Sequence, residues 1–226
     1  MSDKHVAAVA RALTILDCFE GEHHLLKLKD IAEKTGMYKS TILRLAGTLE
    51  HHGYLRQNED GAYMLGPTLW RLGSLYRNRF DYASHIRPTL RRLAEATSES
   101  ASFYVRDGDV RVCLLRQNGP QAIRHHLDEG AHLTLNAGAA GHLIRAYTDG
   151  SGPLADRILR EGHAVSLGER DPDTASIAVA VIASNGRFAG ALVVSGLRTR
   201  FNAEAREAAI RLAKESAAEL GPSLIV

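Results

Sequence analysis

The chain has 226 residues, of which 45% are hydrophobic and 24% charged, a composition typical of a soluble globular protein long enough for two domains. No apolar run approaches the ~20 residues that a membrane span needs, and Met1 to Val9 lacks a signal-peptide core. We therefore expect a cytoplasmic protein with no membrane partner. Cys18 and Cys113 lie far apart without a Cys-x-x-Cys spacing, which favours buried free thiols over a disulfide or a metal site.

Three stretches near the N-terminus have the spacing of amphipathic helices. The first is predicted to end near Gly21, and the second, around Ile31 and Ala32, to end at Gly36, because glycine readily adopts the left-handed conformation that closes helices. The third begins near Tyr38. The apolar stripe of the first helix is Val9, Ala12, Leu13, Leu16 and Phe19, and that of the third is Ile42, Leu45, Ala46 and Leu49.

The face of the third helix opposite its apolar stripe carries hydroxyls and a guanidinium. These groups read base edges and phosphates in a major groove, and the glycine-containing turn before the helix is the turn of a helix-turn-helix. Lys39 adds positive charge at the start of the same helix. The exposed residues on this face are Ser40, Thr41, Arg44, Thr48 and His51.

A short hairpin follows, because Tyr54 to Gln57 and Ala62 to Leu65 alternate in polarity around a turn that ends in Asp60-Gly61. Such a ribbon is a wing, and Arg56 and Asn58 near its tip are placed for the phosphate backbone or the minor groove. The segment thus predicts a winged helix-turn-helix that binds double-stranded DNA. The alternative is a helical hairpin beside an edge ribbon that binds nothing.

The charge is divided unevenly along the chain, whose net charge is +2. Residues 1–66 contain 8 Lys plus Arg against 9 Asp plus Glu, so any DNA affinity has to come from the placement of Lys39, Arg44 and Arg56. Residues 67–97 contain 6 basic against 2 acidic residues, an arginine-rich stretch that fits either a DNA backbone contact or a solvated helix face.

After Pro67 the helical spacing continues through Leu69, Leu72 and Tyr76 and predicts a linker helix, and residues 86–97 predict a further helix. Beyond them the pattern changes to strands, and the second half is predicted to be α+β, an antiparallel sheet with helices around it. The predicted strands are 101–105, 110–114, 122–127, 177–183 and 188–194, and the predicted helices are 140–147, 153–160 and a last one capped by Asn202 that runs to Leu220.

From about Val9 to Gly221 the chain resembles the IclR family of bacterial transcription regulators. The resemblance is carried by KSTILRLAGTLEHHGYL followed by YMLGPTLWRLG, by LTLNAGAAGHLIRAY, and by GHAVSLGERDPDTASIAVAV with ALVVSG. It implies a winged helix-turn-helix in residues 1–66, a dimerising linker helix in 67–82 and a GAF/PAS-like effector-binding domain in 83–226. It also implies operator binding as a homodimer or homotetramer, and a small organic or aromatic carboxylate as effector.

The resemblance implies an effector pocket at the backbone N–H groups of Ala139 and Ala140, a placement that suits a carboxylate because a helix N-terminus attracts anions. Ser176 and Ser195 would face the pocket from the sheet, and Ser166 from a loop ahead of Glu169. His142 stands where the family usually has lysine and Val193 where some members have a polar residue, which favours a more apolar pocket and a larger or aromatic acid. Without the resemblance, a tight strand-to-helix turn at residues 139–141 with ordinary hydrogen-bonded sheet serines is the favoured explanation of this region.

Arg124 and His126 alternate on the predicted strand 122–127, which we expect to border the pocket, so either side chain is a candidate to neutralise the acid. An ordinary surface arginine explains Arg124 as well. The pairs His23-His24, His51-His52 and His125-His126 do not predict a metal site, because neighbouring side chains diverge on a helix or a strand.

These observations predict a ligand-responsive transcription regulator with no cofactor, no metal and no catalytic residue. No nucleophile elbow, P-loop, dinucleotide fingerprint or zinc spacing is present. One alternative is an enzyme that acts on a small carboxylate and uses its helical domain for assembly. Another is a structural protein that stays bound to DNA without a ligand.

Overall fold

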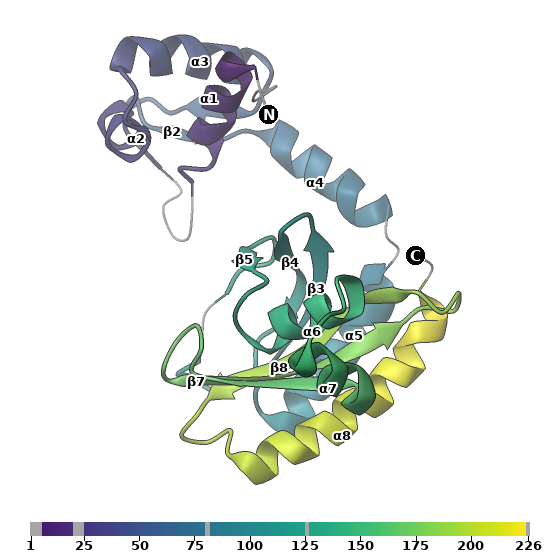
Figure 1. Cartoon of the computed structure of the whole chain (residues 1–226). Helices are drawn as coiled ribbons and strands as arrows, with labels where there is room; N and C mark the ends of the chain where they lie inside the picture. Colours follow the sequence, from purple (N-terminus) through teal and green to yellow (C-terminus); the bar gives the residue numbers. More distant parts are fainter. Residues whose placement is uncertain (1–5, 20–24, 80–81, 125–126, 225–226) are drawn as a thin grey trace. The chain divides into compact units, whose positions relative to one another are not determined.

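The computed structural model describes residues 6–19, 25–79, 82–124 and 127–224. The chain divides into two compact units, Met1–Phe80 and Asp81–Val226, so the predicted linker helix belongs to the first of them. The first unit contains α1 (Ala7–Leu16), α2 (Leu28–Thr35), α3 (Lys39–His51), β1 (Leu55–Gln57), β2 (Tyr63–Leu65) and α4 (Pro67–Arg79) (Figure 1).

The apolar stripe predicted for α3 is confirmed, because Ile42, Ala46 and Leu49 are buried in the core of the first unit. The end predicted for α2 is also confirmed. Gly36 has a φ of 67°, and its N–H donates to the carbonyl of Ala32 over 2.9 Å. The helix is thereby closed just before the turn into α3, which sets the angle between the two helices.

The apolar stripe predicted for the first helix is only partly right. Ile15 is fully buried, whereas Val9 is 56% and Leu13 53% exposed, and the helix ends at Leu16 rather than near Gly21, which lies outside the described residues. The helix carries apolar residues on two flanks, and periodicity alone does not say which flank meets α3. The second flank remains uncovered within this unit.

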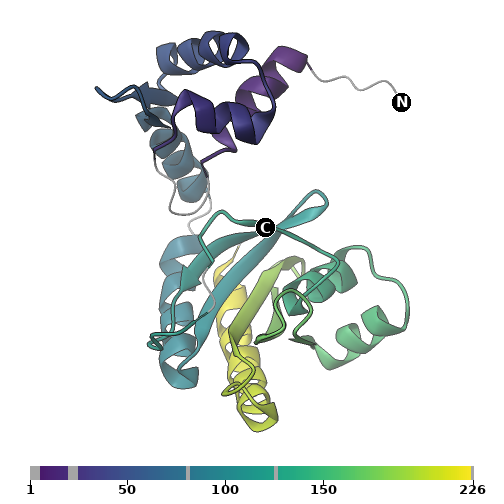
Figure 2. The same ribbon diagram turned by 90° about the vertical axis from the view of Figure 1, so that its left-hand side faces the viewer.

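The second unit is built on one antiparallel sheet of six strands in the order β5-β4-β3-β8-β7-β6. Helices α5 and α8 pack on one face, whereas α6 packs on the other with α7 beside it (Figures 1 and 2). The elements are α5 (Tyr82–Thr97), β3 (Ser100–Asp107), β4 (Val110–Gln117), β5 (His132–Thr134), α6 (Ala139–Thr148), α7 (Pro153–Glu161), β6 (His163–Leu167), β7 (Thr174–Ile182), β8 (Phe188–Leu197), α8 (Ala203–Leu220) and the 3-10 turn η1 (Gly221–Ser223).

Most predicted elements of this unit are confirmed, but one predicted strand is wrong and two strands, β5 and β6, were not predicted. Residues 121–124 form no strand, and the short strand that pairs with β4 is His132–Thr134 instead. An edge strand of three residues is defined by its partner rather than by its own pattern, which explains the error. Residues 163–167 form strand β6 and not the predicted loop, so Ser166 lies within the sheet.

Two of the arginines in residues 67–97 serve the second unit itself. Arg87 forms a bidentate ion pair with Glu129 over 3.0 and 3.1 Å, and Arg92 pairs with Glu219 over 2.5 Å. The basic stretch therefore contributes to internal contacts, and only part of it remains for a polyanion.

Replacing Asn202 with alanine is expected to lower the free energy of unfolding of the second unit by about 1 kcal/mol. The Asn202 side-chain oxygen accepts the N–H of Ala205 over 3.0 Å, and alanine leaves that N–H at the start of α8 without its acceptor. Urea denaturation measures the change. Asn202→Ser is the matched control, because serine retains a capping oxygen and should keep the wild-type midpoint. Equal midpoints for the alanine and serine variants would contradict the cap.

Candidate functional site

The polar face of α3 is open to solvent. Lys39, Ser40, Arg44 and Thr48 are exposed and Thr41 is half-buried. Residues 40, 44 and 48 follow one another at intervals of four along the helix, so they form one row on its surface. Within the described chain, no ion pair or hydrogen bond engages the Arg44 guanidinium, which leaves five donors free for a ligand.

A groove of about 280 Å³ runs between α1 and this face of α3. Arg11 of α1 and Arg44 of α3 line it together with Thr41 and Thr48, so two guanidinium groups border one concave surface. Arg11 was not among the residues predicted to contact DNA, because the pattern of the first helix does not indicate that this side chain lies beside α3.

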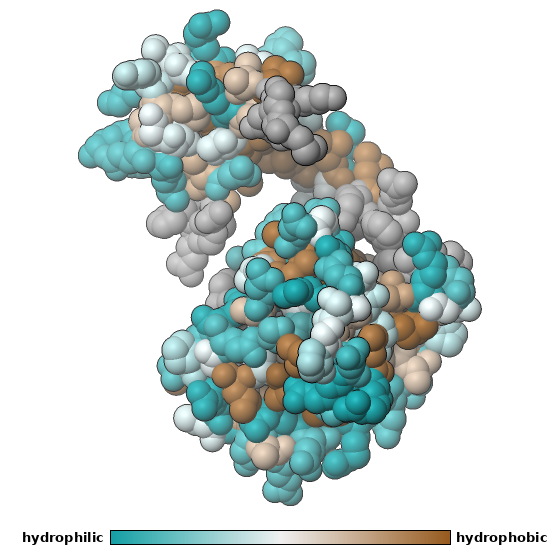
Figure 3. Space-filling model, viewed as in Figure 1, coloured by the Kyte–Doolittle hydropathy of each residue, from teal (hydrophilic) through white to brown (hydrophobic). Residues whose placement is uncertain are grey.

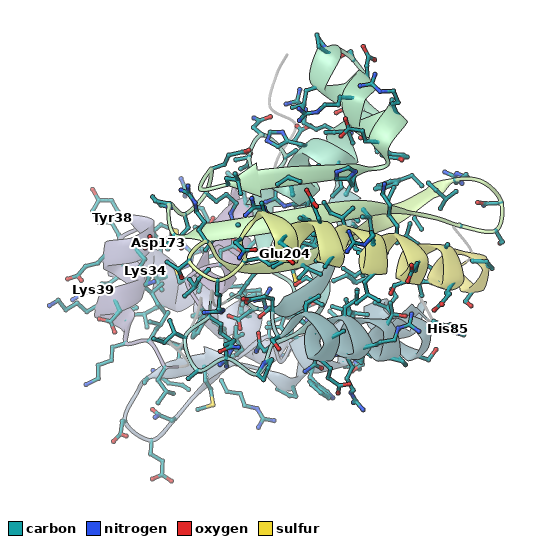
Figure 4. All side chains as sticks on the ribbon, turned by 90° about the horizontal axis from the view of Figure 1, so that it is seen from below. Lys34, Tyr38, Lys39, His85, Asp173 and Glu204 are labelled. Carbon is teal, nitrogen blue, oxygen red and sulfur yellow. The ribbon has the colours of Figure 1, made fainter. Side chains whose placement is uncertain are left out.

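The beginning of α3 presents further groups to solvent. Tyr38 is 85% exposed and precedes the helix in an extended conformation. In Figure 4, its side chain points outward close to those of Lys34 and Lys39. An exposed tyrosine and two exposed lysines near the start of α3 suit contacts with a phosphate backbone. Tyr38 was predicted only to mark the start of the third helix and was not among the residues predicted to contact DNA.

The predicted wing is present as β1 and β2, which pair in register from Leu55 with Leu65 to Gln57 with Tyr63. Arg56 is exposed on β1. Asn58 holds the turn, because its side-chain oxygen accepts the N–H of Ala62 over 2.8 Å. The amide nitrogen of Asn58 forms none of the hydrogen bonds of the described chain, so it can donate to a ligand.

In the second unit, three serines form one row across the sheet. Strand pairing places Ser166 of β6 opposite Ser176 of β7, and Ser176 opposite Ser195 of β8. Residues directly opposite each other project from the same face of a sheet, and this face is the one covered by α6. All three serines line a cavity of about 40 Å³ together with Ala139 and Ala140 at the start of α6.

Helix α6 begins with Gly138 as its N-terminal cap, at a φ of 85°. Glycine tolerates this angle, and the chain can then enter the helix beside the cavity. The Gly138 N–H donates to Glu169 Oε2 over 2.8 Å, and His142 Nε2 lies 2.6 Å from the same oxygen. Burial alone would raise the pKa of Glu169, but hydrogen bonds from Gly138, His142 and Ser166, together with the electrostatic attraction of His142, hold the pKa below its usual range.

The cavity contains a charged group that the sequence analysis missed. Arg111 of β4 is 2% exposed, and its Nη1 donates to the carbonyl of Thr134. The Tyr104 ring lies 5.7 Å from its guanidinium carbon, within the range of a cation–π contact. Burial lowers the pKa of Arg111 to about 10, so the side chain is still a cation at neutral pH.

One of the predicted pocket residues, Arg124, is not found in the cavity. Arg124 is exposed in a loop, where its Nη1 donates to the carbonyl of Gln121, and it does not line the cavity. His126 lies outside the described residues. The lining also includes charged and hydroxyl-bearing side chains: Arg111, Glu169, Arg170, Thr174 and the three serines.

Metal ligation finds no support in the part of the chain that the structure describes, where no group of three His, Cys, Asp or Glu side chains is placed to hold an ion. The prediction for the cysteines is confirmed, because Cys18 and Cys113 are both buried thiols outside any disulfide. None of the described helices is long and apolar enough to cross a membrane.

Acidification is expected to destabilise the second unit partly through Glu169. Its folded-state pKa lies below the ordinary 4.5, so its stabilisation is present above the unfolded-state pKa and is lost as pH falls through the folded-state value. Melting temperatures between about pH 6 and 3 should therefore fall more steeply for the wild type than for Glu169→Gln. Glu207→Gln, on the exposed side of α8, is the control and should follow the wild type. Parallel curves for the wild type and Glu169→Gln would contradict this role.

Both units match known protein families. Residues 8–59 match the IclR helix-turn-helix domain, and residues 75–151 and 154–221 match the domain described as bacterial transcriptional regulator IclR C-terminal. The chain belongs to the IclR family. The predicted family is therefore confirmed, as is the fold class of an N-terminal helix-turn-helix followed by an α+β domain. An IclR protein of this kind is a DNA-binding transcription regulator with an effector domain.

Similar IclR proteins cover nearly the whole chain. The HTH-type transcriptional regulator KipR of Bacillus subtilis is 25% identical over 85% of this chain and 87% of its own length. The HTH-type transcriptional regulator BhcR of Paracoccus denitrificans is 28% identical over 96% of this chain and 88% of its own. Relatives over most of the length are thus named as regulators and not as enzymes.

Solved IclR structures share the fold. The IclR regulator of Alicyclobacillus acidocaldarius superposes with a TM-score of 0.78 at 25% identity, over 96% of this chain and 98% of that one. An IclR homologue from Microbacterium hydrocarbonoxydans, solved in complex with 4-hydroxybenzoate, gives a TM-score of 0.79 at 20% identity, over 95% and 98% of the two chains.

Proposed function

We propose that this IclR regulator binds an operator by laying α3 in the major groove, with Ser40, Thr41, Arg44 and Thr48 facing the bases and Lys39, Arg56 and Asn58 nearer the phosphates. The observation that carries the proposal is the solvent-exposed polar row on α3. The opposite face of this helix packs into the hydrophobic core of the first unit. Arg11, beside the same groove, fits a phosphate contact.

The second part of the proposal is that a small organic or aromatic carboxylate binds in the cavity at the start of α6. Ala139 and Ala140 line that cavity together with Ser166, Ser176 and Ser195, which supports the predicted set of effector residues. The 4-hydroxybenzoate complex of the Microbacterium homologue supports an acid as the class of ligand. Binding of the acid would shift the preference of the regulator for DNA by its coupling energy, typically about 1 to 3 kcal/mol.

We also propose that the protein acts as a homodimer or homotetramer assembled partly through α4. Trp70, Leu72 and Leu75 on this helix are 73%, 38% and 57% exposed. Apolar side chains gather over α4 on the surface in Figure 3. Exposed apolar side chains on one helix are typical of a surface that another chain covers, and α4 is the predicted dimerising linker.

The enzyme alternative lacks an activated nucleophile. Cys113 is fully buried, and burial raises the pKa of its thiol to about 11, so it is protonated at neutral pH and is a poor nucleophile. We therefore propose that the protein has no catalytic activity and works in the cytoplasm, where its DNA target lies.

The proposal is tested by selecting bound duplexes from a random DNA library with the full chain and then footprinting the enriched sequence. We expect two related half-sites about one helical turn apart, or a multiple of that spacing, because a symmetric dimer reads a symmetric operator. Sedimentation of the same protein gives its oligomeric state. Failure to enrich any duplex at low salt would overturn the proposal.

A further inference from the structure

Arg111 is a buried cation without an ion-pair partner in the described chain, which is rare in a stable protein. Its guanidinium is buried, its Nε has no hydrogen-bond partner, and its one hydrogen bond in the described chain goes to the Thr134 carbonyl. No carboxylate of the described residues forms an ion pair with it. A buried cation without a counter-ion is costly, and the Tyr104 ring compensates the Arg111 charge only in part, so an anion beside it would be stabilising.

The guanidinium lies against the first turn of α6. A Cβ at Gly138 would lie 3.2 Å from Arg111 Nη2, and a Cβ at Gly141 would lie 2.7 Å from Nη1. Glycine at these two positions therefore makes room for the guanidinium. The same turn holds Ala139 and Ala140, whose N–H groups have no partner among the recorded bonds of the described chain.

The cavity thus brings together a buried cation and the positive end of a helix, and both favour an anion at one point. The nearby carboxylate does not fill this role, since Glu169 is bound to Gly138 and His142. Arg170 also lines the cavity, but it is exposed and screened by solvent. Arg111 is thus the one buried charge among the described lining residues, and one anionic group would balance it.

The size of the cavity limits what enters it. A volume of about 40 Å³ accommodates a group the size of a carboxylate, since a bound water requires roughly 10 to 15 Å³ by the same measure. The hydroxyls of Ser166, Ser176 and Ser195 lie on the sheet side of this space and can donate to further oxygen atoms of the same molecule.

We propose that Arg111 is the specificity-determining cation of the effector site. It holds the carboxylate of a monoanionic acid jointly with the N–H groups of Ala139 and Ala140, and it rejects neutral analogues of the same shape. This inference rests on the proposed function, because it takes the cavity to be the effector site.

The test compares acids with their neutral amides on the full-length protein. Calorimetric titration with pyruvate, lactate and 4-hydroxybenzoate is expected to detect at least one acid, whereas lactamide and 4-hydroxybenzamide should not bind. Arg111→Met removes the charge and retains an apolar side chain of similar length, so the domain should fold with an unchanged or higher melting temperature. It should lose at least tenfold in affinity for the acid.

Two further variants keep the result interpretable. Arg111→Lys retains a buried cation without the planar fork, and we expect partial loss of affinity and retained discrimination against the amide. Arg187→Met is the matched control at an exposed arginine outside the cavity, and we expect it to leave the acid affinity unchanged. If Arg111→Met does not fold, the lysine variant and the acid-to-amide comparison decide the question.

Operator binding measured without acid separates the role of Arg111 in binding the acid from the proposed function of the protein as a DNA-binding regulator. If the wild type binds the operator and an acid, but Arg111→Met binds the acid with wild-type affinity, the role of Arg111 is wrong and the proposed function stands. If the amides bind as tightly as the acids, or if none of the three acids binds, the inference is overturned. If the wild type does not bind DNA, the proposed function fails independently of Arg111.

Discussion

Replacing Arg200 with alanine is expected to lower the free energy of unfolding of the C-terminal unit by about 3 kcal/mol. Arg200 Nε lies 2.6 Å and Nη2 3.0 Å from the two oxygens of Glu99, a bidentate pair that links the end of β8 to the beginning of β3. The Glu99 side chain is only 5% exposed, so removing its partner leaves a carboxylate without compensation inside the protein.

The neighbourhood shows that the fold is built around this carboxylate. A Cβ at Gly196 would overlap the Glu99 side chain, so glycine there makes the space for it. We expect the double variant Glu99→Gln/Arg200→Ala to be more stable than Arg200→Ala alone, because the glutamine carries no charge. Chemical denaturation of the three proteins gives the comparison.

Arg187→Ala is the control for the loss of an arginine. Arg187 is exposed next to the β7–β8 turn, and we expect a change within about 0.5 kcal/mol. If Arg200→Ala were as mild as this control, the pair would contribute nothing measurable to stability.

The N-terminal unit could be predicted in detail because its signals are local. Gly36 ends one helix, the stripe from Ile42 to Leu49 defines the next, and Asp60-Gly61 defines the wing. Each of these depends on residues within one or two turns of each other. The exposed face of α3 followed directly, since the side of a helix opposite its buried stripe faces solvent.

Arg111 escaped prediction for a physical reason. In a sheet with one open face, an arginine that alternates with Val110 and Val112 points to solvent. Here helices cover both faces, so alternation no longer separates buried from exposed, and Arg111 is buried more deeply than Leu114. A covered face is a property of the whole fold, which the strand alone does not encode.

The row of serines depends on long-range register. Ser166, Ser176 and Ser195 come from three strands, and only their pairing brings the hydroxyls to one line. In the sequence analysis these residues came from family resemblance, which carries register information that local patterns lack. The resemblance did not assign a role to Arg124. Its predicted place beside the pocket depended on a strand at residues 122–127, and residues 121–124 form no strand in the structure.

Replacing Arg44 with alanine is expected to weaken operator binding by about 1 to 3 kcal/mol, up to roughly a hundredfold in affinity. The Arg44 guanidinium is exposed at the centre of the polar row on α3 and forms no ion pair or hydrogen bond within the described chain. The substitution therefore removes the proposed DNA contact without opening a cavity in the protein. A bidentate contact with a guanine is the interaction that such a side chain makes best in a major groove.

Footprinting and fluorescence anisotropy on the selected operator measure the loss. Arg160→Ala is the control, because Arg160 is exposed on α7 in the other unit, outside the basic stretch 67–97, and its loss changes the net charge equally. Lys39→Ala separates base reading from phosphate attraction: it should weaken all duplexes alike and reduce the salt slope by about one, whereas Arg44→Ala should relax specificity at one base position. A normal footprint from Arg44→Ala, with unchanged sequence preference, would move the reading surface away from this face of α3.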